Sequence, residues 1–266
     1  MSSLNFLGNE TSYLSVPNSA ALNFRTGDFT VEWQQYQTDI NPYPRIFQMG
    51  SFANFINIGV SIEKILGTEQ SIFYFWRNST PNSIAELNSI EYKNVWVHFA
   101  ISRSSGTTRI FMNGTQIGSI ADTNDYNSTA ELTIGNEETK SDIAAFGGYM
   151  TYFSWNKGFA KYTSNFTVPT GFPPILPSTM FMFTAYGFFG TVGSTAVNSN
   201  VGGFLSVPSG YDATPPTPLP TTTTETIQRL FTSLYTNNAQ VYYKHNSLAS
   251  GGVSTVRNSR SKARRT

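Results

Sequence analysis

Apolar and polar residues alternate with a period of two along much of the chain. The clearest stretch runs from Val95 to Ile120, VWVHFAISRSSGTTRIFMNGTQIGSI, where two strand-like segments lead into the pair Asn113-Gly114. An Asn-Gly pair accepts positive φ at both central positions of a type I′ turn, which makes it a strong hairpin signal. The pattern therefore predicts antiparallel β structure.

The same kind of pattern predicts ten short strands, separated by segments rich in Gly, Asn, Pro and Ser. No helical period of 3.6 residues interrupts the series before residue 222. Many short strands with turns between them favour an all-β sandwich or jelly roll, with the alternating aromatic residues buried between two sheets. The predicted strands are Tyr13–Val16, Phe29–Tyr36, Arg45–Gly50, Asn54–Ile62, Ser71–Trp76, Val95–Ser102, Thr108–Met112, Glu131–Ile134, Gly148–Trp155 and Met180–Tyr186.

Composition supports a sheet-packed protein, because 15% of the residues are aromatic and only 12% are charged. The chain has no cysteine, which excludes disulfides, thiolate metal sites and thiol nucleophiles. No apolar run approaches the roughly 18 residues that a membrane span needs. The N-terminus lacks the basic and apolar regions of a secretory signal, so we expect no signal peptide and synthesis in a cytoplasm.

The sequence changes character after the strand-rich part. Residues 208–225, PSGYDATPPTPLPTTTTE, contain five prolines, which block ladder hydrogen bonds and hold a chain extended. We therefore expect a jelly-roll domain over residues 1–207, a linker rich in Pro and Thr over 208–224, and a C-terminal segment over 225–266.

Two features stand out in that C-terminal segment. Apolar residues at helical spacing follow Thr222 and Glu225, which have the spacing of a capping box, so the pattern predicts a short amphipathic helix whose apolar stripe needs a partner. The last residues form a basic tail with no acidic residue, and we expect it to be disordered until bound. Apolar positions of the helix are Ile227, Leu230, Phe231 and Leu234, and the basic residues after Asn246 are Arg257, Arg260, Lys262, Arg264 and Arg265.

Several short motifs occur in a fixed order over three quarters of the chain. They are Phe6-Leu7-Gly8, Tyr13-Leu14-Ser15-Val16-Pro17, Gly27-Asp28-Phe29-Thr30-Val31-Glu32-Trp33, Trp96-Val97-His98-Phe99-Ala100, Phe111-Met112-Asn113-Gly114, Leu132-Thr133-Ile134-Gly135 and Phe146-Gly147-Gly148-Tyr149-Met150. With this order and spacing, residues 4 to about 207 resemble a laminin-G-like, concanavalin A-like jelly roll of glycan-binding modules and of phage and giant-virus proteins. Asn113 departs from the usual Asp of that family, which is harmless in a turn. Residues 158–174 are similar to the viral and phage branch.

The last residues, HNSLASGGVSTVRNSRSKARRT, resemble a terminal signature of structural proteins of large double-stranded DNA viruses of algae. This resemblance implies a minor capsid protein, located in the virion and attached through its C-terminal arm to major and other minor capsid proteins. The apolar positions of the predicted helix would anchor it, and the basic residues of the tail would supply charged contacts. The alternative partner of the basic tail is nucleic acid, whose phosphates the tail would bind.

The alternative function is a glycan-binding module that recognises a polysaccharide of a host wall or surface. Trp76 and Trp155 could stack on a sugar ring, although core packing is the commoner role of aromatic residues in a sandwich. A rim segment offers hard oxygen ligands for a sugar or for calcium, although such residues often only cap turns. Its candidate residues are Asp122, Asn124, Asp125 and Asn127.

The sequence predicts no catalytic site, and no cofactor apart from the calcium alternative. Glucanases need two nearby carboxyl groups, and no Glu-x-Asp-x-Glu run occurs. Glu137 and Glu138 are adjacent, so on a strand they would point to opposite faces. His98 lies in a strand, where we expect a packed structural histidine, and His245 lies beside the tail, a poor place to preorganise chemistry.

Overall fold

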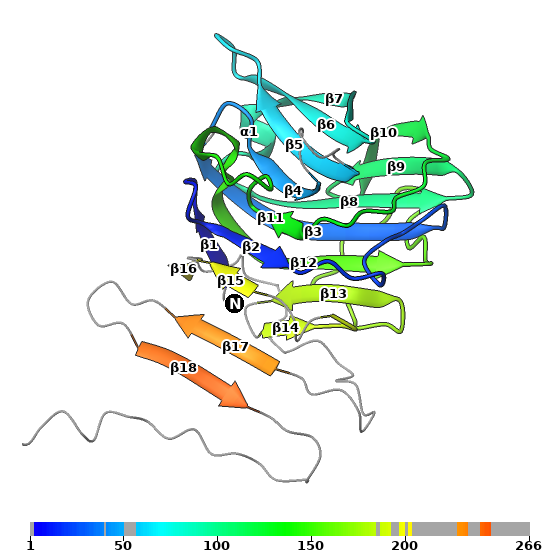
Figure 1. Cartoon of the computed structure of the whole chain (residues 1–266). Helices are drawn as coiled ribbons and strands as arrows, with labels where there is room; N and C mark the ends of the chain where they lie inside the picture. The colour runs from blue at the N-terminus through cyan, green and yellow to red at the C-terminus, as the bar shows by residue number, and fades with distance from the viewer. Residues whose placement is uncertain are drawn as a thin grey trace, which may run out of the picture.

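Two antiparallel sheets pack face to face and form a β-sandwich (Figure 1). The computed structural model describes residues 3–39, 41–50, 57–184, 187–192, 197–199, 202–203, 228–233 and 240–245. Within these ranges helical structure is confined to α1 (Ser89–Tyr92) and a 3₁₀ turn at Asp142–Ala144. The predicted all-β sandwich is confirmed. No helix in the described part of the chain is long and apolar enough to span a membrane.

The larger sheet, sheet A, has the order β10-β9-β8-β3-β12-β1-β16, with β13 beside β12 and β14 beside β13. The long strand β12 joins its two halves, because it pairs with β3 along its whole length and with β1 and β13 on the other side. The bounds are β1 (Leu4–Leu7), β3 (Phe29–Asp39), β8 (Trp96–Ser104), β9 (Thr107–Met112), β10 (Thr115–Ala121), β12 (Gly147–Lys157), β13 (Thr179–Thr184), β14 (Gly187–Phe189) and β16 (Gly202–Gly203).

The second sheet, sheet B, has the order β15-β2-β11-β4-β5-β6-β7. It brings the N-terminal strand β2 beside β11, which lies more than 100 residues later in the sequence. The bounds are β2 (Tyr13–Val16), β4 (Arg45–Met49), β5 (Ile58–Lys64), β6 (Gln70–Arg77), β7 (Thr80–Asn88), β11 (Leu132–Ile134) and β15 (Val197–Ser199).

An aromatic core fills the space between the sheets. Trp33 of β3 is fully buried and stacks on Phe99 of β8, with ring centroids 5.4 Å apart. It also meets Phe47 of sheet B edge to face at 5.9 Å, so the two sheets share one cluster. Trp155 is likewise fully buried and donates a hydrogen bond from Nε1 to the carbonyl of Leu22 (3.0 Å). Burial of alternate residues between two sheets is what the sequence pattern predicted.

The predicted Asn-Gly hairpin is present. Asn113 and Gly114 have φ values of 48° and 79°, and they join β9 to β10 through the pair Met112 and Thr115. Positive φ at both central positions matches the type I′ turn, whose twist suits the flanking strands. The prediction missed six strands of the two sheets. The strands β1, β14, β15 and β16 have at most four residues, whereas β7 and β10 lie largely at the surface and lack a continuous apolar alternation.

The helix predicted in the C-terminal segment is wrong where the structure describes it. Residues Gln228–Ser233, which include Leu230 and Phe231, form strand β17, and this strand pairs with β18 (Gln240–His245). A helix of two or three turns is marginal by itself, whereas the Val and Tyr residues of β18 favour a strand. Pairing also gives hydrogen-bond partners to the backbone groups on the facing edges of both segments. The boundary at 207, the linker 208–224, Ile227, Leu234 and the basic tail lie outside the described residues.

Candidate functional site

A segment after β12, residues 158–178, covers part of the outer face of sheet A; we call it the strap. Its backbone is tied to the sheet by hydrogen bonds from the Lys161 amide to Thr30 Oγ1 (2.8 Å) and from the Phe166 amide to the Gly114 carbonyl (2.9 Å). The rings of Tyr162 and Phe166 pack on Phe111. The strap therefore covers this part of the outer face of sheet A.

A buried carboxylate, Glu32, holds the strap to the sheet. Tyr162 donates its hydroxyl to Oε2 (2.9 Å), Lys161 donates from Nζ to Oε1 (2.8 Å), and His98 Nε2 lies 3.4 Å from Oε2. Burial alone would raise the pKa of Glu32, but the hydrogen bond with His98 and the charge of Lys161 together lower this pKa below its usual value. His98 is thus a packed, hydrogen-bonded residue, as its strand position predicted.

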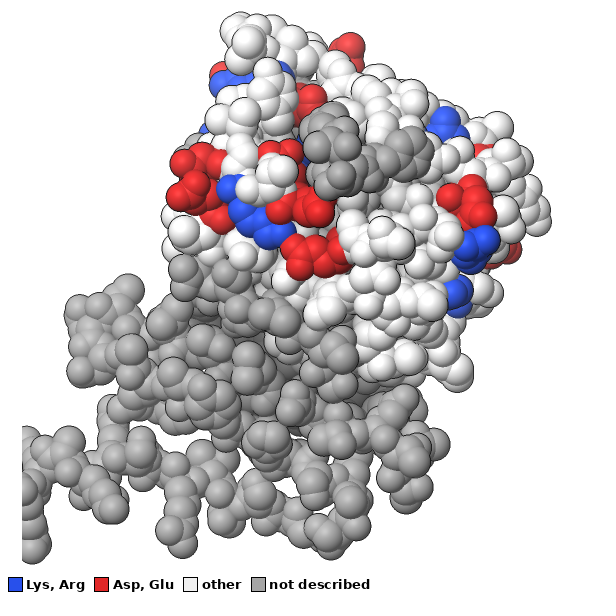
Figure 2. Space-filling model, viewed as in Figure 1, with Lys and Arg blue, Asp and Glu red and all other residues white. Residues whose placement is uncertain are grey.

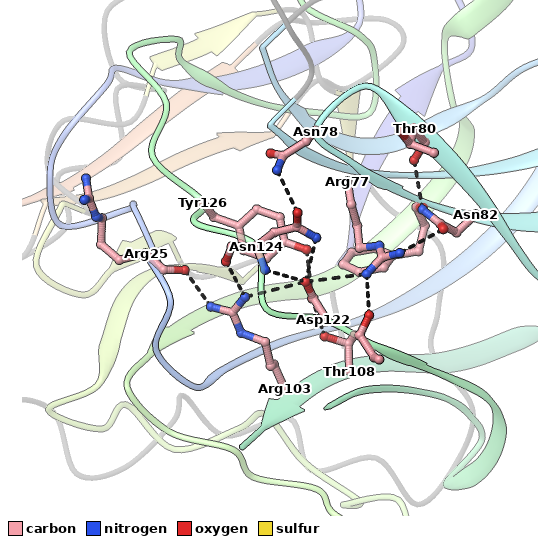
Figure 3. A network of polar contacts seen from close by, with 12 residues as sticks. Arg25, Arg77, Asn78, Thr80, Asn82, Arg103, Thr108, Asp122, Asn124 and Tyr126 are labelled. Carbon is pink, nitrogen blue, oxygen red and sulfur yellow. Dashed lines mark hydrogen bonds and ion pairs between the residues drawn. The ribbon is translucent and has the colours of Figure 1, made fainter. Parts of the chain in front are cut away.

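The predicted rim residue Asp122 lies in a buried polar network (Figure 3). Its Oδ2 accepts hydrogen bonds from Thr108 Oγ1 (2.6 Å) and from the Tyr126 hydroxyl (2.8 Å). Two guanidinium groups face Oδ1, with nitrogen atoms of Arg77 at 3.6 Å and of Arg103 at 3.8 Å. Burial raises the pKa of Tyr126, and the charge of Asp122 raises it further. The hydrogen-bond donors and positive charges around the Asp122 carboxylate are therefore supplied by other side chains of the protein.

Arg103 forms the other half of this network. Its guanidinium donates to the backbone carbonyls of Gly27 and Arg25, and it lies between the rings of Phe29 and Tyr126, 4.9 and 4.8 Å from their centroids. Burial lowers the pKa of Arg103, although the nearby Asp122 opposes the effect. The network connects the loop before β3 with the loop after β10.

The remaining rim candidates have different environments. Asn124 donates from Nδ2 to Asp122 Oδ1 (2.9 Å) and accepts from Asn78 (2.8 Å), so its amide is also structural. Asp125 forms an exposed ion pair with Arg25 (3.0 Å), and Asn127 is exposed. Among the residues that the structure describes, no three His, Asp or Glu side chains gather as they would around a metal ion. The structure thus does not bring the four candidates together around an open site.

The fifth glycan candidate, Trp76, lies in a hollow of about 420 Å³ on the outer face of sheet B. Val60 and Ile62 of β5 point into the core, so Ser61 and Glu63 point outward. The hollow has a volume typical of a small-molecule site. Its lining residues are Tyr43, Arg45, Glu63, Trp76, Glu137, Ile143 and Ala144. Figure 2 shows that acidic and basic side chains lie close together in part of the visible face, whereas most of the described surface in view is uncharged.

A chain of polar contacts crosses three strands at the floor of the hollow. Trp76 donates from Nε1 to Ser61 Oγ (2.9 Å), and Ser61 donates to Glu63 Oε1 (2.7 Å). Arg45 donates from Nη1 to the same oxygen (2.7 Å) and from Nε to Gln48 Oε1 (3.1 Å). The Arg45 guanidinium also lies over the Trp76 ring, 4.6 Å from its centroid. These contacts fix the rotamers of the floor, which is the preorganisation that a binding site needs.

The lip of the hollow is more open than the floor. Tyr43 and Ile143 are 43% and 55% exposed, and their segments are joined by a hydrogen bond from the Tyr43 amide to the Ile143 carbonyl (3.1 Å). Glu137 reaches the hollow from the loop after β11 and accepts a hydrogen bond from Thr139 (2.8 Å). The site therefore combines an exposed aromatic ring, an exposed aliphatic side chain and two carboxylates.

Sequence reasoning found only Trp76 among these lining residues. Tyr43 precedes β4 and Arg45 begins it, and Glu63 is the last but one residue of β5. Glu137 lies in the loop after β11 and Ile143 in the 3₁₀ turn that follows, so no spacing along the chain links these residues. The only signal was local, because Arg45 and Glu63 are charged residues at the ends of apolar strands. A search for acidic residues on a single strand could not detect the two carboxylates of the hollow, Glu63 and Glu137, because they lie on different segments.

Comparisons with known proteins agree with the observed architecture. The sequence profile of the concanavalin A-like lectin/glucanases superfamily matches residues 7–157. No curated protein matches the sequence.

Among solved structures, a putative carbohydrate binding protein from Bacteroides ovatus superposes with a TM-score of 0.50 at 15% identity, over 69% of this chain and 51% of that one. A pentraxin from Limulus polyphemus gives a TM-score of 0.46 at 13% identity, over 58% of this chain and 75% of the other. A CBM40 domain of a Ruminococcus gnavus sialidase, bound to α2,3-sialyllactose, gives 0.45 at 11% identity, over 61% and 94%. At 15% identity, the likeness to the Bacteroides ovatus protein is one of fold.

Proposed function

We propose, from the premise that this chain belongs to the concanavalin A-like lectin/glucanases superfamily, that it is a carbohydrate-binding module whose sugar site is the hollow on sheet B. The observation that carries the proposal is the composition of the hollow. Sugar rings have apolar faces that pack on aromatic and aliphatic side chains, and hydroxyl groups that donate to carboxylates. Tyr43 and Ile143 supply the first kind of contact, and Glu63 and Glu137 supply the second.

Two further points support this proposal. The structural relative from Bacteroides ovatus is described as a putative carbohydrate binding protein. The strap already occupies part of the outer face of sheet A, whereas the hollow on sheet B is open at its lip.

The test is a glycan array with the full chain, followed by titration calorimetry with any sugar that binds. The variant Tyr43→Ala removes the exposed ring and should weaken binding about tenfold, because truncating an aromatic contact residue commonly costs more than 1 kcal/mol. Leu66→Ala is the matched control, since Leu66 is also an exposed apolar residue but does not line the hollow. Absence of any sugar binding, or equal effects of the two variants, would contradict the proposal.

The same samples test hydrolysis, because glycosidases use pairs of carboxyl groups and two line the hollow. We expect no release of reducing ends. Glu63 Oε1 accepts from both Arg45 and Ser61, which ties this carboxylate into the floor and leaves only its second oxygen for a substrate. Release of reducing ends by the wild-type protein, if Glu63→Gln abolishes it, would show that the protein is a glycosidase.

The role as a virion component remains a prediction. The residues that would attach the chain to capsid proteins or nucleic acid lie in the C-terminal segment, of which the structure describes only β17 and β18. Deleting residues 222–266 should prevent incorporation into particles if this role is correct. A capsid role and a sugar-binding role are compatible, because one domain can carry both.

A further inference from the structure

We infer that the hollow binds neutral sugars and rejects acidic ones, an inference that rests on the proposed function. Among the residues that the structure describes, the charged groups that line it are one guanidinium, Arg45, and two carboxylates, Glu63 and Glu137. The formal charge of the lining is thus negative. An acidic sugar carries a carboxylate of its own, and binding it next to like charges is unfavourable unless a cation is available to pair with it.

Arg45 is not available for that purpose. Its side chain is only 4% exposed, and Nη1 and Nε already donate to Glu63 and Gln48. One face of the guanidinium also lies on the Trp76 ring. An incoming carboxylate would have to displace Glu63 from Arg45, which would leave the carboxylate of Glu63 without its ion-pair partner.

The nearest basic residue in the loop that carries Glu137 is also engaged. Lys140 is ion-paired with Glu131, and its ammonium lies over the Tyr13 ring, 5.0 Å from the centroid. Neither Lys140 nor Glu131 lines the hollow.

The accessible polar atoms of the lining suit hydroxyl groups instead. The Glu63 side chain is 17% exposed, and only its Oε1 is used by Arg45 and Ser61. Glu137 uses Oε1 for Thr139. The second oxygen of each carboxylate can therefore accept from a sugar hydroxyl, while Tyr43 and Ile143 contact the apolar face of the ring.

The experiment compares matched pairs of neutral and acidic sugars on the full chain by calorimetry. Suitable pairs are lactose and sialyllactose, methyl-esterified and free oligogalacturonides, and xylo-oligosaccharides without and with glucuronic acid. We expect the neutral member of any pair that binds to bind at least about tenfold more tightly. Glu137→Gln keeps the size of the side chain but removes its charge. It should therefore reduce the gap, meaning the ratio of the affinities for the neutral and the acidic sugar, severalfold. Glu86→Gln, on an exposed residue of β7 outside the hollow, should leave the gap unchanged.

The outcomes separate this inference from the proposed function. Acidic sugars that bind as tightly as their neutral partners would overturn the charge selection and leave sugar binding intact. An unchanged gap in Glu137→Gln would also overturn it, because the discrimination would then not come from this charge. If no sugar binds, the proposed function fails and the inference fails with it.

Discussion

The guanidinium of Arg103 and the carboxylate of Asp122 face each other in the interior, with Nη1 and Oδ1 3.8 Å apart and both side chains almost fully buried. Arg77 approaches the same oxygen from β6, so one carboxylate serves two cations. The pair links β8 to the loop after β10 and packs against the ring of Tyr126. This network stabilises the end of the sandwich where the sequence had suggested an open rim.

Asp122→Asn should lower the free energy of unfolding by about 3–5 kcal/mol, because it leaves buried Arg103 without its counter-charge. Chemical denaturation with urea measures the change. Asp125→Asn is the control, since Asp125 lies three residues later and forms an exposed ion pair with Arg25, which should contribute less than about 1 kcal/mol. Similar losses in the two variants would contradict a structural role of the buried pair.

Glu32→Gln should lower the free energy of unfolding by about 2 kcal/mol at pH 7, because hydrogen bonds to a charged group are lost. The pKa of Glu32 is lower in the folded state than its usual value of 4.5. The carboxylate therefore stabilises the fold above pH 4.5, and this contribution is lost as the pH falls through the folded-state pKa.

Denaturation curves at several pH values should thus show the wild-type protein and Glu32→Gln converging below pH 4.5. The exposed Glu86→Gln variant should follow the wild type throughout. A constant difference between wild type and Glu32→Gln at all pH values would show that the ionised form of Glu32 is not what stabilises the strap.

Gly114→Ala should be much more disruptive than Gly67→Ala, although both glycines have φ of +79°. At Gly67 an added Cβ meets nothing within 4 Å, so only the left-handed backbone is penalised, by about 1–2 kcal/mol. At Gly114 the Cβ would lie 2.0 Å from the carbonyl oxygen of Phe166, so the strap must also move. Urea denaturation measures stability, and trypsin cleavage after Lys161 reports on the strap. Equal stability and equal cleavage rates in the two variants would show that the strap does not rest on this turn.

Calcium should not stabilise residues 122–127. Asp122, the buried acid of this segment, is bound by Thr108 and Tyr126 and flanked by two guanidinium groups, which would repel a cation. The melting temperature should be the same with excess calcium and with a chelator. A calcium-dependent rise that Asp125→Asn abolishes would show that this loop does bind the ion.

Much of the sandwich could be predicted from the sequence. The strand at Tyr13–Val16 was predicted with its observed bounds, and the Asn113-Gly114 turn has the expected positive φ values. Alternate residues such as Trp33 are buried, as the pattern required. These features are local, since side-chain direction in a strand and backbone preference in a turn depend on neighbouring residues.

The tertiary structure decided the rest. Leu230 and Phe231, two positions of the predicted helix, lie in strand β17, because pairing with β18 supplies backbone partners that the segment alone cannot show. From the sequence, Asp122 is expected to be a solvent-exposed loop residue. In the structure Arg77 and Arg103, from two different strands, lie beside it. The hollow has the same origin: Tyr43, Glu63 and Glu137 are distant in sequence and meet only because sheet B places β4, β5 and the loop after β11 side by side. Sequence periodicity fixes which face a residue occupies, but the order of strands in a sheet fixes its neighbours, and a binding site depends on those neighbours.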